Sequence, residues 1–139
     1  MSTATIAQDH DHEHHGPPTG IKRWLMSTNH KDIGTMYLVF ALIMLFLGSA
    51  SAMVIRAELF MRGLQLVQPD LYNNLVTNHA LIMIFGAVMP AAAGLANWMI
   101  PLMIGAPDMA LPRMNNLSFW ILPAAATMLI LSFVVPFFP

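Results

Sequence analysis

His79 is the residue best suited to chemistry, because it lies in a run of 37 residues, 71–107, without Asp, Glu, Lys or Arg. An imidazole inside a membrane-spanning helix costs free energy unless something binds it, and neutral imidazole is a common metal ligand. Asp108 and the amides of Asn115 and Asn116 follow the run. A carboxylate carries protons, and amides donate to and accept from water chains. The combination predicts redox chemistry coupled to proton movement.

The composition is that of a membrane protein. Of the 139 residues, 57% are hydrophobic and 9% are charged, against about 25% charged in an average soluble domain. The mean hydropathy is +0.62. The absence of cysteine excludes disulfides and thiolate metal sites formed by this chain. The net charge of −1 argues against a nucleic-acid partner. The apolar composition makes membrane lipid the expected surrounding.

Three windows without charged residues divide the sequence. They are 33–55, 71–107 and 114–139. Each exceeds the ~20 residues that an α-helix needs to cross a bilayer. The predicted helices lie at about 33–55, 74–100 and 117–139. The sequence therefore predicts an all-α integral membrane protein with three transmembrane helices.

Short polar residues, small residues and prolines indicate how these helices begin, pack and bend. Asp32 is expected to cap the first helix, which should end before Arg56. Small residues at 48–52 give this helix a face suited to close approach by another helix or a cofactor. Pro90 removes the hydrogen bond to the carbonyl of Gly86 and is expected to bend the second helix there.

Residues 1–21 form a polar segment that is rich in histidine. Its histidines are His10, His12, His14 and His15. We expect a disordered cytoplasmic tail, and the alternative is weak binding of zinc or copper. The segment lacks both the apolar core of a secretory signal and the arginine-rich character of a mitochondrial transit peptide. This favours the inner (plasma) membrane of a bacterium, with residues 22–139 as the membrane part.

The distribution of positive charge predicts the orientation. Basic residues before the first span and after the second are Lys22, Arg23, Lys31 and Arg113. Arg56 and Arg62 lie between these spans. Because Lys and Arg gather in cytoplasmic loops, the N-terminus is expected in the cytoplasm. His79 then lies toward the outer surface and Asp108 toward the inner one.

Longer motifs surround the residues named above. They are STNHKDIGT at 27–35, IRAEL at 55–59, TNHALIMIF at 77–85, NW at 97–98, PLMIGAPDMALPRMNN at 101–116 and SFW at 118–120. Over residues 22–123 the chain resembles subunit I of the haem–copper oxidases, and more narrowly the cytochrome c oxidases of the aa3 type. The resemblance implies an N-terminal fragment with the first three of about twelve spanning helices.

The resemblance implies roles for three residues toward the outer surface. His79 would be one of two axial ligands of the low-spin haem a, rather than a histidine satisfied between helices. Arg56 would hydrogen-bond the formyl group of haem a, with interfacial snorkelling as the alternative. Glu58 matches a position that helps some members to bind calcium or sodium, with a solvated loop acid as the alternative.

At the inner surface, the resemblance implies the D pathway of proton uptake. Asp108 matches the entrance acid of this pathway, and a helix cap is the alternative. Asn97 and Asn115 match amides that order water just inside the entrance, and Asn116 is their neighbour. Loop capping is the alternative for these amides.

One departure from the family pattern lies in the second helix. Six residues, 91–96, separate Pro90 from Asn97, where many relatives carry seven. A missing residue turns one half of a helix by about 100° relative to the other unless a bulge absorbs it. The alignment of His79 and Asn97 on one helix face therefore depends on such a bulge.

The resemblance implies part of a proton-translocating terminal oxidase of aerobic respiration. The complete subunit would pass electrons from cytochrome c through haem a to haem a3 and a copper ion, reducing oxygen to water while protons are pumped. The remaining metal ligands would lie beyond residue 139, so the chain alone should be inactive. Its implied partners are the remainder of subunit I and oxidase subunits II and III. The alternatives are a quinol oxidase subunit I fragment and a stand-alone three-helix haem-binding membrane protein.

Overall fold

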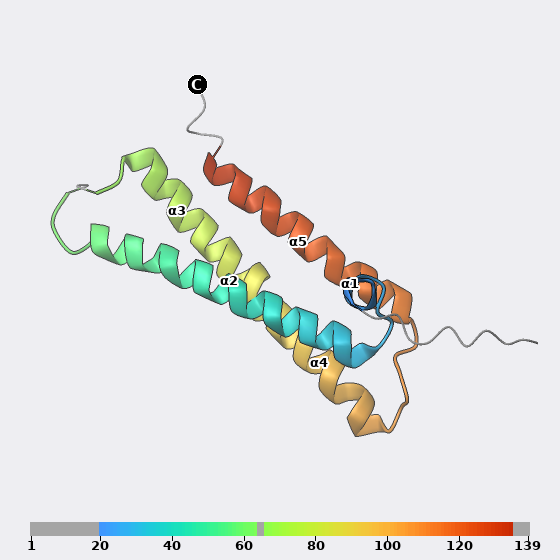
Figure 1. Ribbon diagram of the computed structural model, residues 1–139. Helices are drawn as coiled ribbons and strands as arrows, with labels where there is room; N and C mark the ends of the chain where they lie inside the picture. The colour runs from blue at the N-terminus through green and yellow to red at the C-terminus, as the bar shows by residue number, and fades with distance from the viewer. Residues whose placement is uncertain (1–19, 64–65, 135–139) are drawn as a thin grey trace, which may run out of the picture.

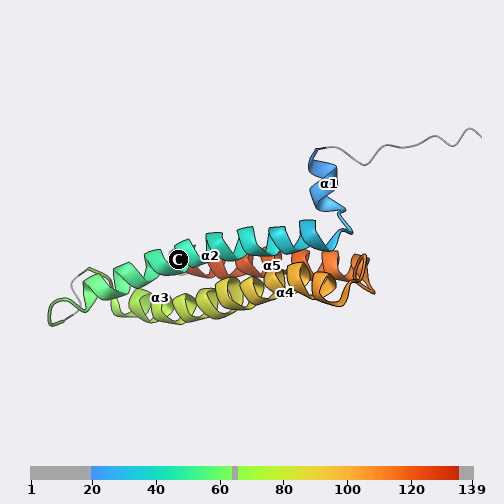
Figure 2. The ribbon, with the colours of Figure 1, turned by 90° about the horizontal axis from the view of Figure 1, so that it is seen from below.

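The computed structural model describes residues 20–63 and 66–134, without the side chains of Lys22 and Val134. Most of the predicted tail, residues 1–19, lies outside the described residues. The first described element is the short helix α1 (Ile21–Leu25), which the sequence did not predict. In Figure 2, α1 projects from one end of the bundle formed by the longer helices.

The first spanning helix, α2 (His30–Glu58), begins earlier than predicted. Its cap is Asn29, whose Oδ1 accepts from the Lys31 N–H at 3.0 Å, so the prediction that Asp32 caps the helix is wrong. Asp32 lies in the first turn, where it pairs with Arg23 at 3.2 Å and accepts from the Ser27 hydroxyl at 3.2 Å. Asp32 is thus the third residue of the helix, and its carboxylate binds side chains outside α2 instead of capping it.

The second span is continuous from Pro69 to Ile104 but is not uniformly α-helical. It consists of α3 (Pro69–Leu81), the π-helix η1 (Ile82–Val88) and α4 (Met89–Ile104). The wide turn lies directly before Pro90, and the Met89 N–H bonds to the carbonyl of Ile84, five residues back. A proline has no N–H for the α-helical pattern, and a π-helical turn is one way to accommodate this.

The third spanning helix, α5 (Pro112–Val134), also begins before its predicted start at residue 117. Pro112 suits the first position of a helix, because an N–H at this position has no partner within the helix. Asn115 and Asn116 therefore lie in the first turns of α5 rather than in a loop. The predicted end of this helix, residues 135–139, lies outside the described residues.

The spanning helices form one bundle in which α2 packs along α3, η1 and α4, and α5 packs against α2, η1 and α3 (Figure 1). Buried Ile33, Met36, Tyr37 and Phe119 form one core cluster between α2 and α5. Three of the described helical segments are long and apolar enough to cross a membrane. The prediction of a helical, multi-pass membrane protein is confirmed.

Candidate functional site

His79 lies half-buried on α3, where its ring meets the small-residue face of α2. Its Nδ1 is 2.9 Å from the carbonyl oxygen of Gly48 and 3.0 Å from Oγ of Ser51. A carbonyl oxygen only accepts, so Nδ1 carries the proton and donates it. In the neutral ring, Nε2 then keeps its lone pair, which is the state in which imidazole binds a metal.

Gly48 permits this approach because it has no side chain. A Cβ at this position would collide with Sδ of Met83, which lies one turn after His79 along the second span. The glycine therefore leaves room for the Met83 side chain where the second span passes α2, beside the carbonyl that His79 reaches. The predicted use of the small-residue segment for close approach is confirmed at this position.

Arg56 lies on α2 two turns beyond Gly48, about 12 Å further along the helix axis. Its side chain is exposed in the described structure. The helix continues through Arg56, so the predicted helix end before this residue is wrong. Arg56 therefore presents a guanidinium at the same end of the bundle as His79.

Glu58 is buried at the end of α2, with 4% of its surface exposed. Its Oε2 accepts hydrogen bonds from the backbone N–H groups of Leu66 at 2.9 Å and Val67 at 3.1 Å. The alternative of a solvated loop acid is therefore wrong, because the carboxylate ties the following loop back to the helix. In the described part of the chain, no three His, Cys, Asp or Glu side chains converge as a metal site would require.

At the opposite end, Asn97 and Asn115 meet between α4 and α5. The Asn115 Nδ2–H donates to Oδ1 of Asn97 at 2.9 Å, and Asn97 is 6% exposed. The sequence did not predict this direct contact, and the proposed ordering of water by the two amides stays a prediction. Asn116 is held elsewhere, because its Nδ2–H donates to the carbonyl of Ser27 at 2.6 Å.

Asp108 is exposed in the loop between α4 and α5, and its Oδ1 accepts from the N–H of Met109 at 2.8 Å. The Asn115 amide contacts Sδ of the same Met109 at 3.2 Å. The loop that carries the acid thus touches Asn115, the half-buried member of the amide pair. The exposed carboxylate therefore lies one residue from a side chain that contacts Asn115, whose amide can donate to and accept from water.

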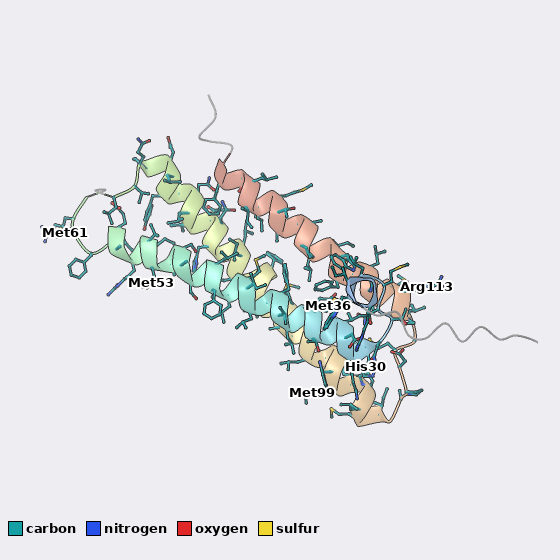
Figure 3. All side chains as sticks on the ribbon, in the orientation of Figure 1. His30, Met36, Met53, Met61, Met99 and Arg113 are labelled. Carbon is teal, nitrogen blue, oxygen red and sulfur yellow. The ribbon has the colours of Figure 1, made fainter. Side chains whose placement is uncertain are left out.

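His30 lies within the STNHKDIGT motif, but the sequence predicts no chemistry for it. Its Nδ1 donates to the carbonyl oxygen of Asn97 at 3.0 Å, and the side chain is 5% exposed. Figure 3 shows His30 and Arg113 at one end of the bundle and Met61 at the other. The backbone of Asn97 is therefore fixed to α2 while its side chain binds α5.

Two hydroxyl groups that the sequence did not single out continue the polar contacts from Asn115, the exposed one of Ser118 and the buried one of Tyr37. The Ser118 hydroxyl donates its one proton to the carbonyl of Asn115 at 2.7 Å. In the 2.8 Å bond between Tyr37 and Ser118, the Tyr37 hydroxyl is therefore the donor and Ser118 Oγ the acceptor. Both side chains line an open surface pocket of about 210 Å³. Its other lining residues are Phe85, Met89, Pro90, Ala93 and Leu122. An isolated Tyr in an apolar helix carries no sequence signal for this contact.

Comparison with known proteins matches residues 32–139 to the family described as "Cytochrome C and Quinol oxidase polypeptide I". The chain is similar to cytochrome c oxidase subunit 1 of Mytilus edulis, with 49% identity over 114 residues, covering 81% of this chain and 21% of the relative. For cytochrome c oxidase subunit 1 of Pecten maximus the identity is 44% over 111 residues, covering 79% of this chain and 23% of the relative. For cytochrome c oxidase polypeptide 1 of Halobacterium salinarum it is 41% over 123 residues, covering 88% and 21%. The chain spans about a fifth of the length of these relatives.

Proposed function

Because this chain belongs to the cytochrome c and quinol oxidase polypeptide I family, we propose that it provides the first membrane helices of subunit I in a respiratory oxidase. The complete oxidase would pass electrons from cytochrome c through haem a to haem a3 and copper, and reduce oxygen to water. Its other components would be the remainder of subunit I and subunits II and III. Cytochrome c is the proposed donor because the similar proteins are named as its oxidases.

The environment of His79 carries the proposed role in haem a binding. The carbonyl of Gly48 accepts the Nδ1 proton at 2.9 Å, which leaves the Nε2 lone pair for iron. These residues fit the group, because a neutral, oriented imidazole is a usual axial ligand. When bound, haem a would supply single-electron transfer toward the oxygen site. Arg56 would donate a hydrogen bond to its formyl group, since a guanidinium stays charged and offers several donors.

Substitution of His79 tests the ligand assignment. His79→Ala in the assembled, haem-loaded oxidase should abolish the absorption and paramagnetic resonance signals of the low-spin haem. Asn73→Ala is a matched control, because Asn73 is exposed on the same helix and its loss should leave both signals unchanged. A low-spin haem that keeps its spectrum in His79→Ala would contradict the assignment.

We further propose that Asp108, Asn97 and Asn115 form the entrance of the proton-uptake pathway. The exposed carboxylate of Asp108 would take protons from the cytoplasm. The hydrogen-bonded amides of Asn97 and Asn115 would order water behind it, and the Tyr37–Ser118 hydroxyl pair continues the polar groups along α5. This chain therefore holds and moves protons at one end and positions an iron ligand at the other.

The proposed location is a bacterial plasma membrane, with the N-terminus in the cytoplasm. The positive residues support the orientation, because those near α1, the start of α2 and the start of α5 lie at one end of the bundle. Calcium binding at Glu58 stays a prediction. The ion would share a carboxylate that already accepts two backbone hydrogen bonds.

A further inference from the structure

Ser51 contacts both partners of the hydrogen bond that orients His79. Its hydroxyl donates to the carbonyl of Gly48 at 2.7 Å, and its Oγ lies 3.0 Å from Nδ1 of His79. A serine hydroxyl has one proton, and here the carbonyl takes it. Toward His79, Oγ is therefore an acceptor, and the Nδ1 proton is shared between two oxygen atoms on one turn of α2.

The helix itself holds the Ser51 hydroxyl in this position. A serine inside a helix bonds back to the carbonyl three or four residues earlier, and the bond to Gly48 follows this pattern. Ser51 is half-buried within a membrane span, where no bulk water competes for its proton. The Oγ atom is thus fixed beside the imidazole ring rather than free to rotate away.

A hydrogen-bond acceptor at one imidazole nitrogen changes the basicity of the other nitrogen. An oxygen that accepts the Nδ1 proton raises the basicity of Nε2, which makes the ring a stronger electron donor to a bound metal. A stronger donor stabilises ferric over ferrous iron, and hydrogen bonding around the axial ligand is one of the means by which proteins adjust the reduction potential. A second acceptor should therefore lower the potential further than Gly48 alone.

We propose that Ser51 is a positioning residue that lowers the reduction potential of the low-spin haem held by His79. This inference rests on the proposed function, because it assumes that His79 is an iron ligand. The role differs from that of Gly48, whose carbonyl sets the tautomer. Ser51 adds to an orientation that is already fixed, so its loss should change the potential and preserve ligation.

A redox titration of the assembled, haem-loaded oxidase tests the proposal. In Ser51→Ala the low-spin spectrum should persist, since the Gly48 carbonyl still accepts the Nδ1 proton, and the midpoint potential should move to a more positive value. Ser51→Thr keeps a hydroxyl that can bond back to the same turn and should restore a potential near that of the parent. Ser49→Ala is the matched control, because Ser49 is an exposed serine on the same helix.

The outcomes separate this inference from the ligand assignment. A Ser51→Ala potential equal to that of Ser49→Ala, or shifted in the negative direction, would overturn the role of Ser51. Loss of the low-spin spectrum in Ser51→Ala would also overturn it, since Ser51 would then support the fold rather than the potential. A low-spin spectrum retained in His79→Ala would instead refute the ligand assignment, and with it this inference.

Discussion

His79 and His30 show how single imidazole rings are satisfied inside a helix bundle. In each ring Nδ1 donates to a backbone carbonyl of another helix, at 2.9 Å to Gly48 and at 3.0 Å to Asn97. A carbonyl fixes the tautomer in both cases, which leaves a lone pair on Nε2. The rings differ in burial, because His30 is 5% exposed whereas His79 is half-buried. His79 is therefore better placed to bind a group that lies outside these three spans.

Replacement of Asp108 by asparagine tests proton uptake at the scale of one residue. Asp108→Asn removes the titratable proton but keeps the oxygen that accepts from the Met109 N–H, so the loop should retain its structure. Oxygen consumption by the assembled oxidase is expected to fall by about 10²-fold, the lower end of what a positioned proton carrier contributes. Proton pumping, measured as acidification outside vesicles, should fall with it.

Asp70 supplies the control for this prediction, because it is an exposed acid in the first turn of α3 at the opposite end of the bundle. Asp70→Asn should leave both oxygen consumption and pumping unchanged. If Asp108→Asn performs as well as Asp70→Asn, the acid at the α4–α5 loop is not the entrance.

The identities of the candidate site residues could be predicted from the sequence, but their partners could not. His79 and Asn97 are unusual polar residues in apolar spans, so residue type and motif both single them out. The partner that orients His79 is the backbone carbonyl of Gly48, and every residue carries such a group. A sequence gives no signal for which carbonyl lies beside which ring, because this depends on how two helices cross.

At the scale of elements, the contact between α2 and α4 depends on two glycines. A Cβ added to Gly94 would lie 3.0 Å from the carbonyl oxygen of Gly34 and 2.9 Å from Cγ of Leu38. In an isolated helix, Gly→Ala is favourable by about 1 kcal/mol. Here the backbone oxygen cannot move aside independently, so Gly94→Ala should instead destabilise the bundle by about 1–3 kcal/mol.

Thermal unfolding of the detergent-solubilised oxidase, followed by loss of haem absorption, measures this effect. Ala92→Val is the control, because Ala92 is exposed on the same helix and its side chain can grow without a clash between α2 and α4. The Gly94→Ala protein should unfold at a clearly lower temperature than the control. Equal unfolding temperatures would show that the two helices can separate to admit a methyl group.

The existence of the three spans could be predicted because long charge-free windows have few other solutions in a membrane. The residues at which these helices begin could not be predicted in the same way. Asn29 and Asp32 are both good caps, and the choice between them depends on Arg23, which engages the aspartate from outside the helix. The start of α5 at Pro112 precedes the charge-free window, since Arg113 does not interrupt a helix that begins at a membrane edge.

Across the whole molecule, the bundle separates two kinds of chemistry along its length. His79 and Asn97 are 18 positions apart, which corresponds to about 27 Å of rise in an ideal α-helix. Both side chains nevertheless face neighbouring helices, although the π-helical turn between them changes the phase of the second span. Both contacts therefore depend on the π-helical turn. This turn lies before Pro90 and sets how the part of the span that holds Asn97 is rotated relative to the part that holds His79.

The orientation of the bundle in the membrane can be tested with two single-cysteine variants, because the chain has no cysteine of its own. Met61 lies in the α2–α3 segment and Ala110 in the α4–α5 loop, and both are exposed. With the N-terminus in the cytoplasm, Met61→Cys should react with a membrane-impermeant maleimide added to intact spheroplasts. Ala110→Cys should react only after the membrane is opened, because its loop would lie beside the cytoplasm with Asp108.

Inverted membrane vesicles supply the reciprocal measurement, in which Ala110→Cys should label first and Met61→Cys should be protected. The basic residues that predict this orientation differ by two charges between the two sides, since four stand against two. Labelling of Ala110→Cys from outside intact cells would therefore reverse the proposed topology. It would also remove Asp108 from the proton-uptake side while leaving the geometry around His79 intact, because that site depends on helix contacts and not on orientation.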